Sequence, residues 1–128
     1  MIFLLDTHVF IWYTTDNDRL NQRMRSRIDD GDNDILVSMA SVWEMAIKHS
    51  RGMLSFQQQF MEFIRQQLTI NRMELLPIKL EHLEVVARLP FHHRDPFDRL
   101  IIAQSICEEI PLLSVDGMFD AYGITRFW

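Results

Sequence analysis

The stretch MIFLLDTHVFIWY, residues 1–13, opens with the pattern that decides the fold. Residues 2–5 form a short, continuous apolar run that ends at Asp6. An apolar run without polar alternation is typical of a strand that is buried on both faces, as in a parallel sheet. The stretch has no basic start and no small-residue cleavage site, and its polar interruptions leave it short of the ~20 apolar residues of a membrane span. We therefore expect a cytoplasmic protein with no membrane association.

Further apolar runs follow this first one, and segments with helical periodicity separate them. The expected strands after the first are residues 35–37, 75–76, 110–115 and 124–128. The expected helices are residues 18–30, 38–50, 56–68, 80–87 and 95–109. Strands that alternate with helices predict a mostly parallel sheet with helices on both faces, which is an α/β fold.

The length of 128 residues fits one domain, residues 1–128, and no repeat, low-complexity tract or flexible linker divides it. Hydrophobic residues make up 48% of the chain, which suffices for a globular core. The single cysteine, Cys107, excludes an intrachain disulfide framework and favours a reducing compartment.

The net charge of −5 argues against a nucleic-acid enzyme, because phosphate binding usually requires a basic face. Two features weaken this objection. Bound cations would offset the charge of any acids that ligate them. The basic residues also gather in two segments, with Arg19, Arg23, Arg25 and Arg27 in one and Arg88, His92, His93, Arg94 and Arg99 in the other.

Three acids fall at the edge of the sheet where ligands bind in folds of this kind. Asp6 and Asp116 follow expected strands, and Asp98 lies in the first turn of an expected helix. A fourth acid, Glu44, lies in the helix after the second strand, at the border of its buried face. Carboxylates that converge there repel one another unless a cation lies among them. Oxygen ligands without a cysteine cluster select a hard cation, Mg²⁺ or Mn²⁺.

Each of these acids also has an ordinary structural interpretation. Asp6 can cap a helix that starts at the next residue, and Asp116 can serve a turn. Asp98 can complement a helix dipole. Glu44 can form an ion pair with Lys48, four residues further on. Taken singly, none of the four decides between structure and function.

The segment before Asp98 holds further polar candidates. Asp95 precedes a proline, and we interpret it mainly as a helix N-cap that lies beside the site. The residues His92, His93 and Arg94 are interpreted as a solvated loop in preference to a contact with RNA phosphates. His8 is as well explained in the core as at a substrate.

Four segments together resemble the successive motifs of PIN-domain nucleases, and of VapC-like toxins of prokaryotic toxin–antitoxin systems in particular. They are FLLDTHVFIW (3–12), SMASVWEMAIK (38–48), HHRDPFDRLIIAQ (92–104) and LLSVDGMFDAYGI (112–124). The resemblance covers nearly the whole chain, and four motifs in the family's order are far more specific than one.

The resemblance implies a three-layer α/β/α PIN-like fold and a ribonuclease that hydrolyses RNA with a bound Mg²⁺ or Mn²⁺. It implies that the catalytic and metal-ligating residues are Asp6, Glu44, Asp98 and Asp116, with Asp6 and Asp98 the firmest ligands. Thr7 and Ser114 match hydroxyl positions beside the first and fourth acids. A homodimer and a cognate antitoxin are also implied.

Three other functions fit parts of the sequence. A PIN-like module can bind RNA or a protein without cleaving it. A phosphatase with an aspartyl nucleophile usually has a second acid two residues after the first, where this chain has His8. A phospho-acceptor receiver domain needs a lysine after its last strand, and neither Lys48 nor Lys79 lies there.

Overall fold

The computed structural model describes all 128 residues and contains one five-stranded sheet in the order β3-β2-β1-β4-β5. Its strands are β1 (Ile2–Leu5), β2 (Asp34–Ser38), β3 (Glu74–Leu76), β4 (Leu112–Leu113) and β5 (Arg126–Phe127). All four neighbouring pairs are parallel, and Leu4 of β1 is in register with Leu36 on one side and Leu112 on the other. The predicted α/β fold with a parallel sheet is confirmed.

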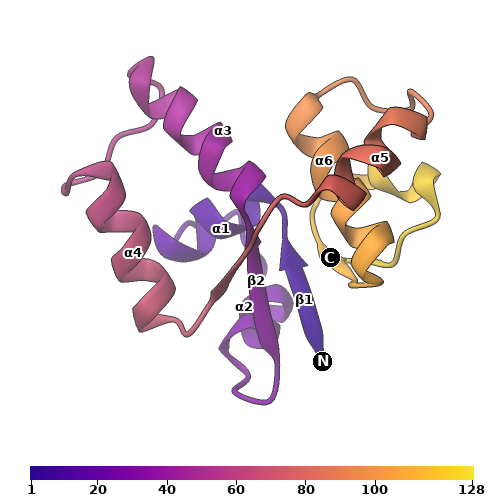
Figure 1. Ribbon diagram of the computed structural model, residues 1–128. Helices are drawn as coiled ribbons and strands as arrows, with labels where there is room; N and C mark the ends of the chain where they lie inside the picture. The colour runs from indigo at the N-terminus through magenta and orange to yellow at the C-terminus, as the bar shows by residue number, and fades with distance from the viewer.

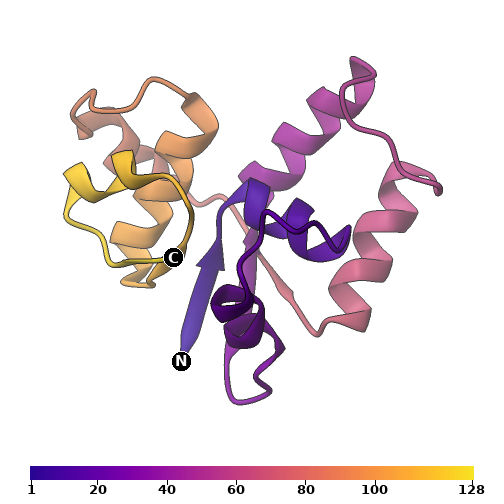
Figure 2. The ribbon, with the colours of Figure 1, turned by 180° about the vertical axis from the view of Figure 1, so that it is seen from behind.

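Six α-helices and one 3₁₀ helix surround the sheet. They are α1 (Thr7–Thr14), α2 (Gln22–Asp29), α3 (Met39–Ser50), α4 (Phe60–Ile70), α5 (Leu80–Arg88), α6 (Pro96–Glu108) and η1 (Gly117–Tyr122). Figures 1 and 2 show α1, α3 and α4 on one side of the sheet and α5 and α6 on the other. None of these helices has the length and apolar character needed to cross a membrane.

The central strand β1 sends its side chains into two separate cores. Phe3 and Leu5 are fully buried in a cluster that α1, α2, α3 and α4 complete. Leu4 is buried in a second cluster with residues of α6 and η1. A strand that is apolar on both faces thus holds one helical layer on each side, and the expected three-layer α/β/α arrangement is confirmed.

Side-chain caps start the helices directly after the strands. Asp6 follows β1 and caps α1 by accepting a hydrogen bond from the backbone N–H of Thr7. Ser38, the last residue of β2, caps α3 through the backbone N–H of Ala40. A polar cap immediately after a strand makes the connection short, and it leaves the capping side chain at the carboxyl edge of the sheet.

Two expected helices are shorter in the structure than their apolar patterns suggest. The pattern that began at Phe56 becomes helix α4 only at Phe60, because Phe56 lies in the preceding loop and stacks on Phe63 with ring centroids 3.9 Å apart. The pattern that began at residue 18 becomes helix α2 only at Gln22, after the cap residue Asn21. In both cases apolar residues that precede the helix also pack in the core, so apolar spacing alone predicts a helix that starts too early.

Candidate active site

The four predicted acids lie where the strand order of the sheet reverses. The chain runs from β1 outward to β2 and β3, and then returns through α5 and α6 to place β4 on the other side of β1. Such a reversal opens a crevice beyond the carboxyl ends of the two central strands. Asp6 ends β1, and its backbone N–H donates a 3.0 Å hydrogen bond to the carbonyl of Leu113 in β4. Asp116 follows β4 closely and therefore borders the same crevice.

Asp6 is a buried carboxylate with a hydrogen-bond donor on each oxygen. Its Oδ1 accepts from the backbone N–H of Thr7 and its Oδ2 from the Ser114 hydroxyl, both at 2.8 Å. Burial raises the pKa of Asp6 above its ordinary value, although both hydrogen bonds and the charge of His8 act in the opposite direction. Asp6 can therefore cap α1 and also belong to the site. Ser114 and Thr7 flank it as expected.

Glu44 is more deeply buried than its helical position predicted. Its Oε2 forms an ion pair with Lys48 Nζ at 3.0 Å, as the spacing of four residues between them predicted. Its Oε1 is also buried, but it has no hydrogen-bond partner. A buried carboxylate oxygen without a donor is costly, and a bound cation in the crevice would satisfy it.

Asp98 shows most directly that the acids are close together. Burial raises its pKa from 3.8 to about 8, and the negative charges of Asp6, Asp95, Glu44 and Asp116 add to the increase. A carboxyl group under the influence of four others keeps its proton at neutral pH, unless positive charge arrives to replace it. Clustered acids with a raised pKa are typical of functional sites.

The other acids of these segments have clear structural roles. Asp95 caps α6, since its Oδ1 accepts from the backbone N–H groups of Phe97 at 2.8 Å and Asp98 at 3.1 Å. Asp116 caps η1 through the N–H of Met118 at 2.9 Å, in addition to its place at the crevice. Asp120 forms an ion pair with Arg126 at 2.7 Å.

His93 belongs to this cluster, and its interpretation as part of a solvated loop was wrong. Its Nε2 lies 3.1 Å from both Asp98 Oδ2 and Asp116 Oδ2, and its side chain is only 12% exposed. The neighbouring His92 is exposed and packs against Tyr122. The sequence His92-His93 does not by itself show which of the two rings faces the acids, because contacts between this loop and distant residues determine it.

Two of the basic residues that seemed available to phosphates face inward instead. Arg99 is buried and donates hydrogen bonds to backbone carbonyls of the loop before α6, including 2.9 Å bonds to Leu89 and Pro90. Arg27 lies over the ring of Phe127, with its guanidinium carbon 4.3 Å from the centroid. The expected basic clusters therefore offer fewer free charges than the sequence suggested.

The acid cluster has the donor chemistry of a site for a hard divalent cation. It consists of the carboxylate oxygens of Asp6, Glu44, Asp98 and Asp116, and the pKa values of Asp6 and Asp98 are raised above their ordinary values. The buried Glu44 Oε1 has no hydrogen-bond partner in the protein. Oxygen donors of this kind fit Mg²⁺ or Mn²⁺.

A second group of potential ligands, His82, Cys107 and Glu108, does not fit a metal. His82 Nδ1 accepts a hydrogen bond from the backbone N–H of Lys79 at 3.0 Å. The neutral ring therefore carries its proton on Nε2, which is the nitrogen that faces Glu108 at 3.7 Å. A nitrogen that carries a proton has no lone pair for a metal.

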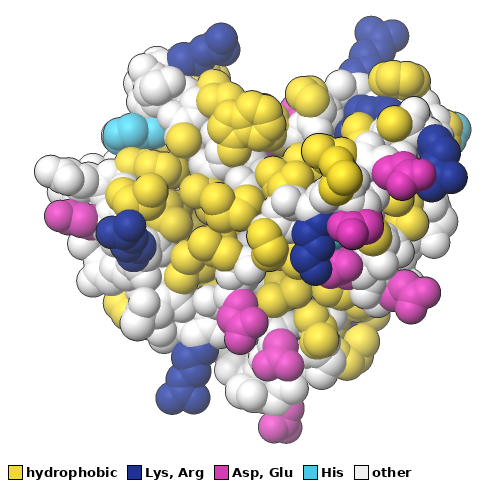
Figure 3. Space-filling model, viewed as in Figure 1, with side chains coloured by type: hydrophobic (Ala, Val, Ile, Leu, Met, Phe, Trp, Pro, Cys, Tyr) yellow, Lys and Arg dark blue, Asp and Glu magenta, His cyan; other side chains and the backbone are white.

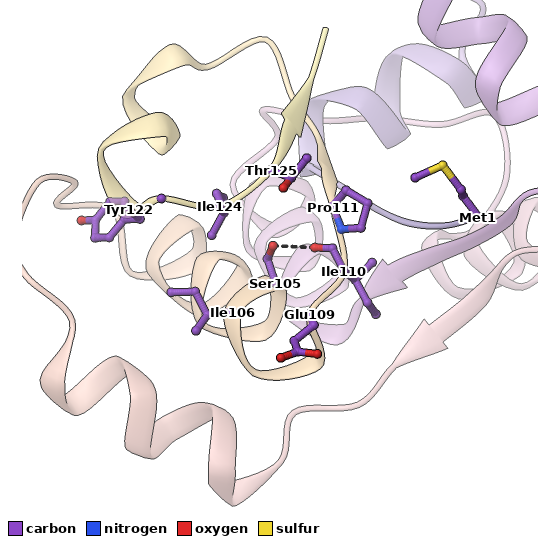
Figure 4. Close-up of a pocket in the computed structure, with 10 residues that line it drawn as sticks. Met1, Ser105, Ile106, Glu109, Ile110, Pro111, Tyr122, Ile124 and Thr125 are labelled. Carbon is purple, nitrogen blue, oxygen red and sulfur yellow. Dashed lines mark hydrogen bonds between the residues drawn. The ribbon is translucent and has the colours of Figure 1, made fainter.

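A surface hollow lies away from the acids. It has a volume of about 540 Å³ and is lined by Met1 before β1, by Ser105 and Glu109 near the end of α6, and by residues 122–125. Figure 4 shows Ser105 in this hollow, where its hydroxyl donates to the carbonyl of Ile110 at 2.6 Å. None of the four predicted acids lines it, so it is separate from the candidate active site.

Several solved structures share this fold. A chain of VapBC2 from Rickettsia felis, solved bound to a DNA fragment from their promoter, has a TM-score of 0.75 at 15% identity, covering 99% of this chain and 98% of that one. VapBC-1 from nontypeable Haemophilus influenzae has a TM-score of 0.67 at 16% identity, with 99% and 97% covered. VapBC-5 from Mycobacterium tuberculosis, a member of the VapBC family of toxin–antitoxin systems, has a TM-score of 0.58 at 19% identity, with 94% and 89% covered.

No curated protein matches the sequence. The comparison with protein families, in contrast, matches residues 3–124 to the PIN domain. This match includes all four acids, His93, most of β1 and all of β2, β3 and β4. The chain belongs to the PIN domain family.

Proposed function

We propose that this protein is a metal-dependent endoribonuclease, formed by a single domain over residues 1–128, and the toxin of a toxin–antitoxin pair. The observation that supports it most is the convergence of four carboxylates on Asp98, whose pKa rises to about 8. Acids that repel one another in this way are costly to ionise together, and a bound cation would offset their charge, which supports the proposal.

Asp6, Glu44, Asp98 and Asp116 would hold Mg²⁺ or Mn²⁺ in this proposal. When bound, such a cation lowers the pKa of water and offsets the negative charge that develops at phosphorus during hydrolysis. Asp98 would give up its proton to bind a cation, because the cation would supply the compensating positive charge. Ser114 and Thr7 hold Asp6 in one orientation from both of its oxygens. Lys48 holds Glu44 by one oxygen and leaves the other free.

RNA is the proposed substrate and an antitoxin the proposed protein partner. The likeness to VapBC chains supports the partner, since VapBC-5 is described as a member of a toxin–antitoxin family. The PIN domain match supports nuclease chemistry as a general property of the family. The proposed location is the cytoplasm, where RNA and antitoxin would both be available.

A homodimer is proposed on the apolar surface formed by Met39, Trp43, Leu80 and Leu83, which we call the α3/α5 patch. These side chains belong to α3 and α5, two helices that both pack against α6, and they are between 38% and 80% exposed. Figure 3 shows hydrophobic side chains gathered over the middle of this face. A second copy of the chain would bury its own identical patch here, as in a two-fold dimer.

Cleavage of RNA by the purified protein tests the enzyme directly. We expect products on a gel in Mg²⁺ or Mn²⁺ and none in a chelator. Asp6→Asn and Asp98→Asn should abolish cleavage and retain the fold, whereas Asp120→Asn, a matched change outside the cluster, should cleave normally. RNA binding that needs no metal and yields no products would instead support a non-catalytic PIN-like module. Full cleavage by Asp6→Asn in Mg²⁺ would refute the assignment of the site.

A further inference from the structure

The backbone on both sides of His93 fixes the position of its ring independently of the acids. Its own N–H donates to the Tyr122 hydroxyl oxygen at 2.7 Å, and its carbonyl accepts from Arg99 Nη1 at 3.3 Å. The ring packs on Phe119, with centroids 5.4 Å apart. Tyr122 is itself held, because its hydroxyl donates to the carbonyl of Pro90 at 2.8 Å. The fold therefore delivers this ring to the crevice before any ligand is present.

A hydrogen bond at the other ring nitrogen, Nδ1, determines which tautomer of His93 is present. The backbone N–H of Asp95 donates to His93 Nδ1 at 3.2 Å, so Nδ1 must offer a lone pair. The neutral ring then carries its single proton on Nε2. Because Asp95 N–H belongs to the residue that caps α6, the start of that helix and the tautomer of His93 are coupled.

The Nε2 atom of His93 lies beside two acids that come from different elements. It is 3.1 Å from Asp98 Oδ2 in the first turn of α6 and 3.1 Å from Asp116 Oδ2 at the start of η1. The hydrogen bond of this nitrogen is to Asp116 Oδ2, whereas Asp98 Oδ2 lies at ion-pair distance. The second oxygen of Asp116 accepts the N–H of Met118. The arrangement therefore fixes both oxygens of Asp116 and leaves Asp98 next to the same ring.

We infer that His93 is a positioning residue of the metal centre: an Nε2–H donor that fixes Asp116 beside Asp98 without binding the metal itself. This inference rests on the proposed function, since it assigns a role toward the same cation. Ligand status is unfavourable because Nε2 has no lone pair while Nδ1 accepts the Asp95 N–H. Metal ligands in proteins are commonly held by such donors, and loss of a donor typically costs about 10–100-fold in affinity.

Titration calorimetry of Mn²⁺ into the metal-free protein tests the inference without measuring activity. We expect His93→Ala to bind Mn²⁺ about tenfold more weakly than wild type or worse. His93→Gln should recover part of the loss, because its side-chain amide can donate an N–H from a similar distance. His92→Ala is the matched control, since His92 is exposed and has no contact with the acids, and it should bind as wild type does.

The outcomes separate this inference from the proposed function. Wild-type or tighter affinity in His93→Ala would overturn the positioning role while the metal site stands. Failure of the wild type to bind Mn²⁺, or full binding by Asp98→Asn, would overturn the proposed function, and the inference with it. Thermal unfolding in a chelator shows whether His93→Ala is folded.

A spectroscopic measurement on the unaltered protein decides the matter even if His93→Ala does not fold. Nitrogen-15 spectra of the histidine rings distinguish protonated from unprotonated ring nitrogens. We expect His93 to keep its proton on Nε2 both without and with saturating Mg²⁺. Movement of the proton to Nδ1 when Mg²⁺ is added would show that Nε2 binds the metal, and it would refute the inference.

Discussion

Ser114 Oγ donates a 2.8 Å hydrogen bond to Asp6 Oδ2 and thereby joins two segments that are 108 residues apart in the sequence. The same hydroxyl oxygen accepts the backbone N–H of Asp116 at 3.0 Å. One buried serine therefore fixes the first acid and the backbone of the last acid relative to each other. The β1–β4 pairing supplies the frame, and Ser114 supplies the direct link between the acids.

Replacement of Ser114 by alanine should weaken metal binding. The hydroxyl lowers the pKa of Asp6, so its loss raises that pKa further and makes the carboxylate harder to ionise. We expect Mn²⁺ affinity near neutral pH to fall about tenfold and the free energy of unfolding to fall by about 1–3 kcal/mol. Ser105→Ala is the control, because Ser105 is also buried but donates to Ile110 in the distant hollow. Equal Mn²⁺ affinities in the two variants would contradict the expectation.

The metal-free protein should lose stability as the pH rises. The pKa of Asp98 is about 8 in the folded protein and 3.8 for a free side chain. Between these values the folded state holds a proton that the unfolded state has released, so the free energy of unfolding decreases with increasing pH. The slope should not exceed about 1.4 kcal/mol per pH unit, and partial exposure reduces it.

Denaturant unfolding in a chelator over this pH range measures that slope. Asp98→Asn should flatten the curve and make the protein more stable than wild type at the alkaline end. Asp120→Asn, which removes an exposed acid paired with Arg126, should keep the wild-type slope. A wild-type curve that rises with pH would mean that Asp98 is not held protonated.

Asp95→Asn should separate capping from metal binding. Asparagine also caps helices well, so this variant should lose at most about 1 kcal/mol of stability and retain Mn²⁺ binding. Asp95→Ala removes the acceptor for the N–H groups of Phe97 and Asp98 and should cost more stability, again with the metal retained. Loss of Mn²⁺ binding in the well-folded Asp95→Asn variant would make Asp95 a ligand.

Glu44 and Lys48 should respond to mutation in opposite directions. Glu44→Gln removes a charged ligand and should weaken Mn²⁺ binding about tenfold or more. Lys48→Met removes a positive charge 3.0 Å from Glu44 Oε2 and should strengthen binding, because a cation then meets less repulsion. Calorimetry on both variants gives the comparison. If Glu44 serves only the ion pair, neither change will alter the affinity.

Leu80→Glu should dissociate the proposed homodimer. Leu80 is 80% exposed in the α3/α5 patch and lies in the first turn of α5, where an acid is favourable for the helix. The fold should therefore survive while the apolar contact is lost. Light scattering after gel filtration reports the mass, and Met53→Glu, an exposed methionine between α3 and α4, is the control. A wild-type protein that is already monomeric at high concentration would disprove the dimer.

The parts of the fold that the sequence predicted are those that local patterns control. Residues 2–5 are apolar on both faces, and they form the central strand of a parallel sheet. Asp95 before Pro96 marks the start of α6 correctly, because a cap and a proline act within one helical turn. The approximate positions of the acids follow, since a residue that ends a parallel strand must lie at the ligand-binding edge.

The parts that were missed depend on contacts between distant segments. Phe56 continues the apolar spacing of α4, but it packs as a loop residue because Phe63 offers it a flat ring. The inward turn of His93 is decided by Tyr122, 29 residues away. From the sequence, Arg99 would be expected at the surface. In the structure it is buried and donates hydrogen bonds to backbone carbonyls that lack helical partners at the end of α5. No local pattern contains these partners.

The position of β4 beside β1 has a consequence for how the protein is made. During synthesis β1, β2 and β3 leave the ribosome well before β4, so one edge of β1 stays unpaired until residues 112–113 have been made. An unpaired apolar edge is a risk for aggregation until its partner arrives. The same order keeps Ser114 and Asp116 away from Asp6 until β4 has emerged. A nascent chain that reaches only as far as β3 is therefore without its acid cluster, and the proposed cleavage of RNA would begin only after β4 and Asp116 have been made.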